Sequence, residues 1–171
     1  MELPIINHPD YVAKINDDNK FPIKKFGALA EYLLKEGVVK KFFKPEECSI
    51  DTMKTSHSLE YINHIKNKTL DIKAQKKIGF PINDSVVRRS FVATGGTVLA
   101  SKLALDSKLA CNTAGGSHHA TFNYGAGYCV FNDVAVAANF LKSKGYAKKI
   151  LIIGLDAVSY THLRAHETLS Y

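Results

Sequence analysis

Two adjacent histidines, His118 and His119, lie in a glycine-rich loop with the sequence AGGSHHATFNYGAGYC. An imidazole that is neutral near pH 7 can take a proton from water and return it to a leaving group, and it can also bind a metal. Because neighbouring side chains diverge in extended backbone, one ion rarely binds both. We therefore expect metal ligands, or an acid and base pair beside a metal that other residues hold.

The elements that position this loop follow from the hydrophobic pattern. Apolar spacing predicts a helix from Phe26 that stops at Gly37, and a short helix that starts at Ser56. It also predicts a helix over 86–107 and another over 132–146, capped by Asn132 or Asp133. LACNTA indicates a short buried strand, and KKILIIGLDA a strand buried on both faces of a parallel sheet.

This order of helices and strands predicts an α/β fold with a doubly wound, mostly parallel sheet flanked by helices. Ligands of such sheets bind beyond the carboxyl ends of the strands. We therefore expect the His118–His119 loop and Asp156, which ends ILIIGLD, at the same rim. Gly95-Gly96 inside a helix disfavours that helix, so we expect another backbone to pack closely there.

Composition narrows the class of protein. The chain has 171 residues and a net charge of +7, but its lysines are scattered, which favours a solvated basic surface over nucleic-acid binding. There is no apolar stretch of membrane-spanning length and no signal-like start, so we expect a cytoplasmic protein. Three cysteines without a CxxC spacing indicate reduced thiols. His57 and His64 lack acidic or cysteine neighbours at ligand spacing and are interpreted as surface or capping residues.

Several motifs, in order, resemble the zinc-dependent histone deacetylase superfamily, in particular its bacterial or class IV members. GGSHHATFNYGAGYCVFND and ILIIGLDA are similar to the family's GG-x-HHA, its G-[FY]-C-x-x-ND and its strand ending in D-x-D-x-H. Upstream, HSLEYINHI resembles the H-x-x-x-Y segment, and the similarity covers residues 4–157. The resemblance implies an arginase/deacetylase-like three-layer fold.

The resemblance also implies roles for individual residues. His119 matches the general base that later acts as the acid, and His118 matches its electrostatic partner. Gly127 and Tyr128 match the wall of a narrow tunnel that binds an acyl-lysine stem, and Asp156 matches the first ligand of the zinc ion. The implied reaction is zinc-dependent hydrolysis of acetyl or other acyl amides on lysine side chains, in proteins or peptides, or on related small amines.

The pattern breaks near the end of the chain. Gly154 stands where the family has an aspartate, and Val158 where it has the histidine ligand. The last residues, VSYTHLRAHETLSY, are similar to a translated sequencing adaptor. We interpret 1–157 as the N-terminal part of one catalytic domain and 158–171 as a non-native tail, and expect this truncated chain to be poorly stable and inactive.

Alternatives remain open at this stage. His162 or His166 could replace the missing ligand, or the protein could be a non-catalytic module that binds acyl-lysine or a partner without metal. An arginase-like enzyme with two manganese ions would need more aspartate and histidine ligands. Cys129 is interpreted as a small wall residue rather than a reactive thiol, and Asn132-Asp133 as a helix start rather than a catalytic pair.

Overall fold

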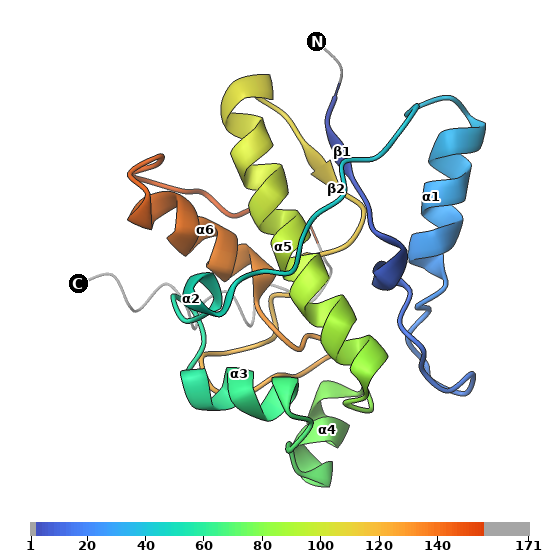
Figure 1. The fold of residues 1–171 in the computed structure, drawn as a ribbon, viewed down its shortest axis with the longest axis vertical. Helices are drawn as coiled ribbons and strands as arrows, with labels where there is room; N and C mark the ends of the chain where they lie inside the picture. Colours follow the sequence, from blue (N-terminus) through green and yellow to red (C-terminus); the bar gives the residue numbers. More distant parts are fainter. Residues whose placement is uncertain (1–2, 156–171) are drawn as a thin grey trace.

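A computed structural model of the protein describes residues 3–155. One long helix, α5, runs through the middle of the molecule, with α6 on one side of it and a two-stranded sheet on the other (Figure 1). The elements in chain order are β1 (Ile5–Ile6), the 3-10 helix η1 (Pro9–Tyr11), α1 (Lys25–Lys35), α2 (Ile50–Met53), α3 (Leu59–Lys66), α4 (Ile72–Ile78), α5 (Asp84–Ser107), β2 (Cys111–Asn112) and α6 (Asp133–Ser143).

The helix ends follow capping chemistry. The side chain of Asn132 accepts a hydrogen bond from the backbone of Ala135, so Asn132 is the N-cap of α6. Gly37, just after α1, has φ +67°, as expected of a glycine that ends a helix. The helix predicted from Ser56 begins later, because Ser58 is the side chain that accepts from the backbone of Tyr61 and caps α3.

The two glycines inside α5 lie where other parts of the chain touch the helix. A Cβ atom at Gly95 would lie 2.0 Å from the carbonyl oxygen of Glu46, and one at Gly96 would lie 2.1 Å from the hydroxyl of Tyr11. Any side chain larger than hydrogen would push these segments away. The expected close approach of another backbone is therefore confirmed at Gly95, and at Gly96 the neighbour is a side chain.

β1 and β2 pair in parallel, with Ile5 opposite Cys111 and Ile6 opposite Asn112. Parallel pairing of these segments agrees with the predicted α/β fold. The strand predicted from LACNTA is present, but Cys111 is exposed, so its expected burial is wrong. The physical reason is that β1 is the strand beside β2 in the part of the chain that the structure describes, and no further strand there covers the other edge.

Residues 150–155 depart from the sequence prediction. They form no strand in the described structure, and Leu151, Ile153 and Leu155 are 83%, 71% and 94% exposed. The prediction of a strand buried on both faces is therefore wrong for these residues. A strand in a parallel sheet needs hydrogen-bonding neighbours and covering helices, and residues 3–155 give this segment neither.

Two neighbouring arginines of α5, Arg88 and Arg89, hold other segments of the chain against this helix. Arg89 is buried, its Nε donates to the carbonyl of Tyr11 at 3.0 Å, and its guanidinium lies over the rings of Phe21, Phe26 and Phe80. Burial lowers the pKa of Arg89, and the negative charge of Asp133 opposes that shift.

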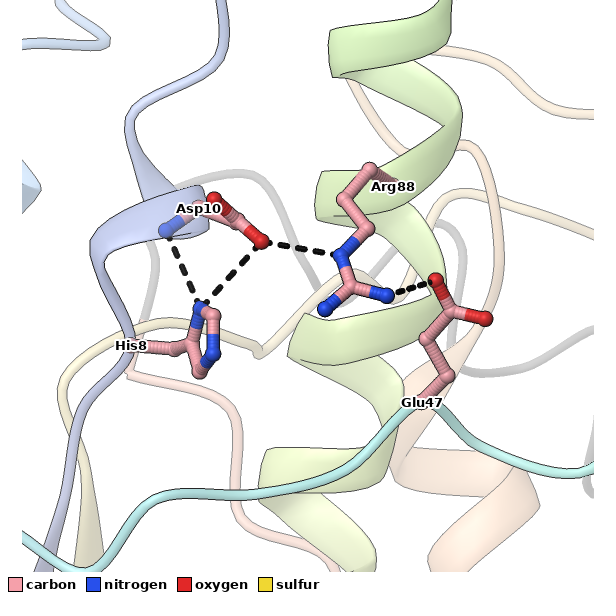
Figure 2. A network of polar contacts seen from close by, with 4 residues as sticks. All are labelled: His8, Asp10, Glu47 and Arg88. Carbon is pink, nitrogen blue, oxygen red and sulfur yellow. Dashed lines mark hydrogen bonds and ion pairs between the residues drawn. The ribbon is translucent and has the colours of Figure 1, made fainter.

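Arg88 points outward and links three segments (Figure 2). Its Nε donates to Oδ2 of Asp10 at 2.9 Å, and its Nη1 donates to Oε1 of Glu47. His8 closes the network, because its Nδ1 accepts from the backbone of Asp10 at 3.1 Å. The network joins η1 and the segment before α2 to the middle helix.

None of the helices in the described range could cross a membrane.

Candidate functional site

The histidine pair lies in the loop that leaves β2. The rings of His118 and His119 are 4.3 Å apart between centroids and inclined by 33°, and both side chains are half-buried. Nδ1 of His118 lies 2.9 Å from the carbonyl oxygen of Gly116. Since a carbonyl oxygen only accepts, this contact places a proton on Nδ1 of His118.

A buried carboxylate holds the loop just before the pair. Oδ2 of Asp133 accepts from the backbone N–H of Gly116 at 3.0 Å, and Oδ1 accepts from that of Ser117 at 2.7 Å. The hydroxyl of Thr97, on α5, also donates to Oδ2. Burial raises the pKa of Asp133, and these hydrogen bonds act in the opposite direction. The carboxylate thus joins α5, α6 and the histidine loop.

Asn132 and Asp133 therefore do different things. Asn132 is the helix start that the sequence indicated, and its Nδ2 also donates to the carbonyls of His118 at 3.4 Å and Ala120 at 3.2 Å. Asp133 holds the loop, which the sequence interpretation missed. An aspartate in the first turn of a helix is so common that its type and spacing gave no signal of a second role.

His57 is a correction to the sequence analysis. It was expected to be a surface or capping residue, but it is 1% exposed and lies among the rings of Tyr61 and Phe131. Its Nε2 accepts from the backbone N–H of Asn132 at 2.9 Å. A long-range partner of this kind leaves no trace in local spacing. His64, by contrast, is partly exposed and pairs with Thr69, in agreement with the prediction.

Gly127 and Tyr128 occupy a tight turn facing the pair. Ala126 and Cys129 exchange two backbone hydrogen bonds, and both residues between them have positive φ, +53° and +63°. Positive φ at both central positions is the signature of a type I′ turn, where a tyrosine is strained. Two bonds from outside the turn hold it, since the N–H groups of Gly127 and Tyr128 donate to the carbonyls of Lys77 and Ile78.

The structure brings four of the five predicted site residues together, His118, His119, Gly127 and Tyr128. A Cβ atom at Gly127 would lie 3.1 Å from Cγ of His119, so the glycine lies directly against that ring. The ring of Tyr128 packs on Phe21 and Phe80, with centroids at 5.1 and 5.4 Å. Cys129 is buried beside them, which agrees with its interpretation as a wall residue, and burial raises the pKa of its thiol.

A metal site needs more than the described residues supply. Within 3–155 no group of three or more His, Cys, Asp or Glu side chains could hold a metal ion. Asp156, Val158, His162 and His166 lie outside the described residues. The donor set in the described part therefore does not fit a zinc ion by itself.

The fold is that of the deacetylase-like α/β proteins. A solved structure of an HDAC homologue complexed with SAHA is similar to 96% of this chain with a TM-score of 0.77 and 23% identity, and the chain covers 47% of it. A structure of an HDAC homologue from Aquifex aeolicus gives a TM-score of 0.67 at 22% identity, over 85% of this chain and 42% of the other. These likenesses confirm the predicted fold class.

Residues 20–158 match the histone deacetylase domain family, and the chain belongs to that family. An uncharacterized protein of Picosynechococcus is 41% identical over 158 residues, which are 91% of this chain and 53% of that protein. Histone deacetylase 2 of Arabidopsis thaliana is 29% identical over 80% of this chain and 38% of its own length. The chain thus spans about half, or less, of the curated relatives that it matches.

Proposed function

We propose that the complete protein containing this chain hydrolyses acyl amides, most simply acetyl amides, of lysine side chains or of related small amines. The observation that carries the proposal is the contact between His119 and Gly127, which puts an imidazole against the turn that carries Tyr128. A proton-transferring group and an aromatic wall then share one short stretch of surface. The SAHA bound to the homologous structure supports a ligand that resembles acyl-lysine.

The residues of this chain divide the work in the proposed reaction. His119 takes a proton from the attacking water and returns it to the amine that leaves. His118 lies beside it, and the hydrogen bond from its Nδ1 to the carbonyl of Gly116 sets the orientation of its ring. Asp133 keeps the loop in place through its two backbone partners. The ring of Tyr128, braced by Phe21 and Phe80, flanks the stem of the acyl-lysine.

A zinc ion is part of the proposed function because of the family resemblance. Asp156 would be its first ligand, and the other ligands, like Asp156, would come from outside residues 3–155. A bound zinc ion would lower the pKa of a water molecule and polarise the amide carbonyl. Because the described residues complete no such site, we propose that residues 1–171 alone are inactive. We further propose that residues 1–157 are part of one catalytic domain, that 158–171 are not native, and that the protein acts in the cytoplasm.

Hydrolysis of an acetyl-lysine peptide by the complete protein tests this function. The proposal expects acetate release that a chelator abolishes and that added zinc restores. Turnover that survives removal of all metal would contradict it.

A second candidate, a binding module without metal, is favoured by Gly154, which stands where the family pattern has an aspartate. Zinc analysis of the complete protein separates the two. One equivalent of zinc per chain supports the enzyme. A protein that contains no zinc but binds a peptide only when its lysine is acetylated supports the module.

A further inference from the structure

The two segments that border Tyr128 are strongly basic. Asn19 donates from Nδ2 to the carbonyl of Gly79 at 3.0 Å, so the loop before α1 and the end of α4 meet beside the tyrosine. Figure 1 shows α4 at the lower end of the view, below α3 and the start of α5. The two segments, 14–25 and 71–77, contain seven lysines and three aspartates. We call these two segments the rim.

Most of this positive charge is not neutralised within the chain. Asp17 pairs with Lys24 at 3.1 Å, and the carboxylate of Asp71 accepts from the backbone of Ala74 as the N-cap of α4. Among the described residues, no carboxylate forms an ion pair with the other rim lysines, which are all exposed: Lys14, Lys20, Lys25, Lys73, Lys76 and Lys77. The rim therefore presents a positive field to whatever approaches Tyr128.

Two of these lysines, one from each segment of the rim, are linked to the turn that carries the tyrosine. Nζ of Lys25 lies 5.1 Å from the ring centroid of Phe21, whose ring is in turn 5.1 Å from that of Tyr128. Nζ of Lys77 lies 3.5 Å above the ring of Tyr124, and the carbonyl of Lys77 accepts from Gly127. A cavity of about 530 Å³ lies along the first of the two rim segments, and Lys14, Lys24 and Lys25 are among its lining residues.

We propose that the rim selects acyl-lysines whose neighbouring residues are Asp or Glu. This inference rests on the proposed function, since it places the acyl-lysine at Tyr128 and the flanking residues against Lys25 and Lys77. Carboxylates fit because both segments of the rim offer unpaired ammonium groups near the turn that carries Tyr128, while flanking lysines would be repelled. A peptide is favoured over nucleic acid because these lysines lie near Tyr128, where the proposed function places an acyl-lysine, and the other lysines are scattered along the chain.

Binding of three labelled peptides to the complete protein tests the proposal. Each carries a central methyl-ketone isostere of acetyl-lysine, which cannot be hydrolysed, with two residues on either side that are all Glu, all Ala or all Lys. At 50 mM salt the Glu peptide is expected to bind about tenfold more tightly than the Lys peptide, and the ratio should approach one at 0.5 M salt. Equal affinities, or a preference for Lys flanks, would overturn the inference.

Charge-changing variants show whether the rim lysines cause the preference for Glu flanks. Lys25→Glu with Lys77→Glu should reverse the preference, and the neutral pair Lys25→Gln with Lys77→Gln should abolish it. Lys144→Glu with Lys148→Glu makes the same change of charge at exposed positions after α6 and should leave the preference unchanged. A reversal that the control pair also produces would overturn the assignment to the rim.

Further binding measurements distinguish a failure of this inference from a failure of the proposed function. A peptide with plain lysine at the centre should bind much more weakly than the isostere. Isostere-dependent binding without a flank preference overturns the inference and supports the proposed function. A Glu preference that is the same for plain lysine overturns the proposed function and the placement at Tyr128. Tighter binding of a single-stranded oligonucleotide, lost in the Lys25→Glu and Lys77→Glu variant, would show that the rim serves nucleic acid instead.

Discussion

The backbone N–H of Ser117 donates a 2.7 Å hydrogen bond to Oδ1 of Asp133, a residue of α6 that is 1% exposed. The other oxygen of the same carboxylate accepts from Gly116 and from the side chain of Thr97 on α5. The loop that carries His118 and His119 is thus fixed by a helix that follows it in sequence. Preorganisation of the pair depends on α5 and α6 packing against each other, as they do in this fold.

Replacing Asp133 with asparagine should loosen this loop. The amide group can accept with only one of its two ends, so at least one N–H of the loop loses its partner, at a cost of about 1 kcal/mol. Relief of the buried charge offsets part of this cost. Urea unfolding should therefore show a lower free energy of unfolding for Asp133→Asn. The exposed Asp106→Asn, on α5, is the matched control and should change stability little; equal stability of the two variants would contradict the role of Asp133.

Gly127→Ala should disturb His119 as well as the backbone. The residue has φ +53°, and the new Cβ atom would lie 3.1 Å from Cγ of His119. Gly145 offers a control, because it has φ +71° but nothing within 4 Å of its added Cβ atom. Both substitutions should lose about 1 kcal/mol to backbone strain. Only Gly127→Ala should move the His119 ring resonances in NMR spectra; unchanged resonances would show that the contact does not matter.

Cys48 should make stability fall at high pH. Burial raises the pKa of its thiol to about 12, from 9.0 without burial. Above pH 9 the unfolded chain loses this proton while the folded chain keeps it, so the contribution present below pH 9 is lost as pH rises toward 12. The free energy of unfolding should fall by up to about 1.4 kcal/mol per pH unit more steeply in the wild type than in Cys48→Ala. Parallel pH profiles for the two proteins would contradict the burial of this thiol.

The exposed apolar segment before Asp156 should drive aggregation of residues 1–171. Leu151, Ile153 and Leu155 present large side chains to solvent in the described structure, and an unpaired apolar segment of this kind invites pairing with another chain. Changing all three to serine should raise the soluble fraction after centrifugation. Leu109→Ser, at a position that is 62% exposed, is the control and should have little effect. Equal solubility of all the variants would remove the segment as the cause.

Local chemistry made much of the molecule predictable from its sequence. The start of α6 at Asn132 and the left-handed Gly37 each follow from one residue and its immediate neighbours. The glycine pair in α5 also predicted a close approach at Gly95, although the sequence did not identify its partner, Glu46. His57 and Asp133 were misread or missed because their partners lie in other segments, Asn132 in one case and the histidine loop in the other. The strand expected near Ile153 failed because a strand is defined by its neighbours, which hydropathy does not reveal.

The proposed mechanism requires the imidazole of His119 to move the proton in an acyl-amide hydrolysis. The most direct measurement is the rate of acetate release from an acetyl-lysine peptide by the complete, zinc-loaded protein and by its His119→Ala variant. We predict a loss of kcat of at least about a hundredfold, as for removal of a general base, with the isostere peptide still bound. A variant that retains the wild-type rate would contradict the account.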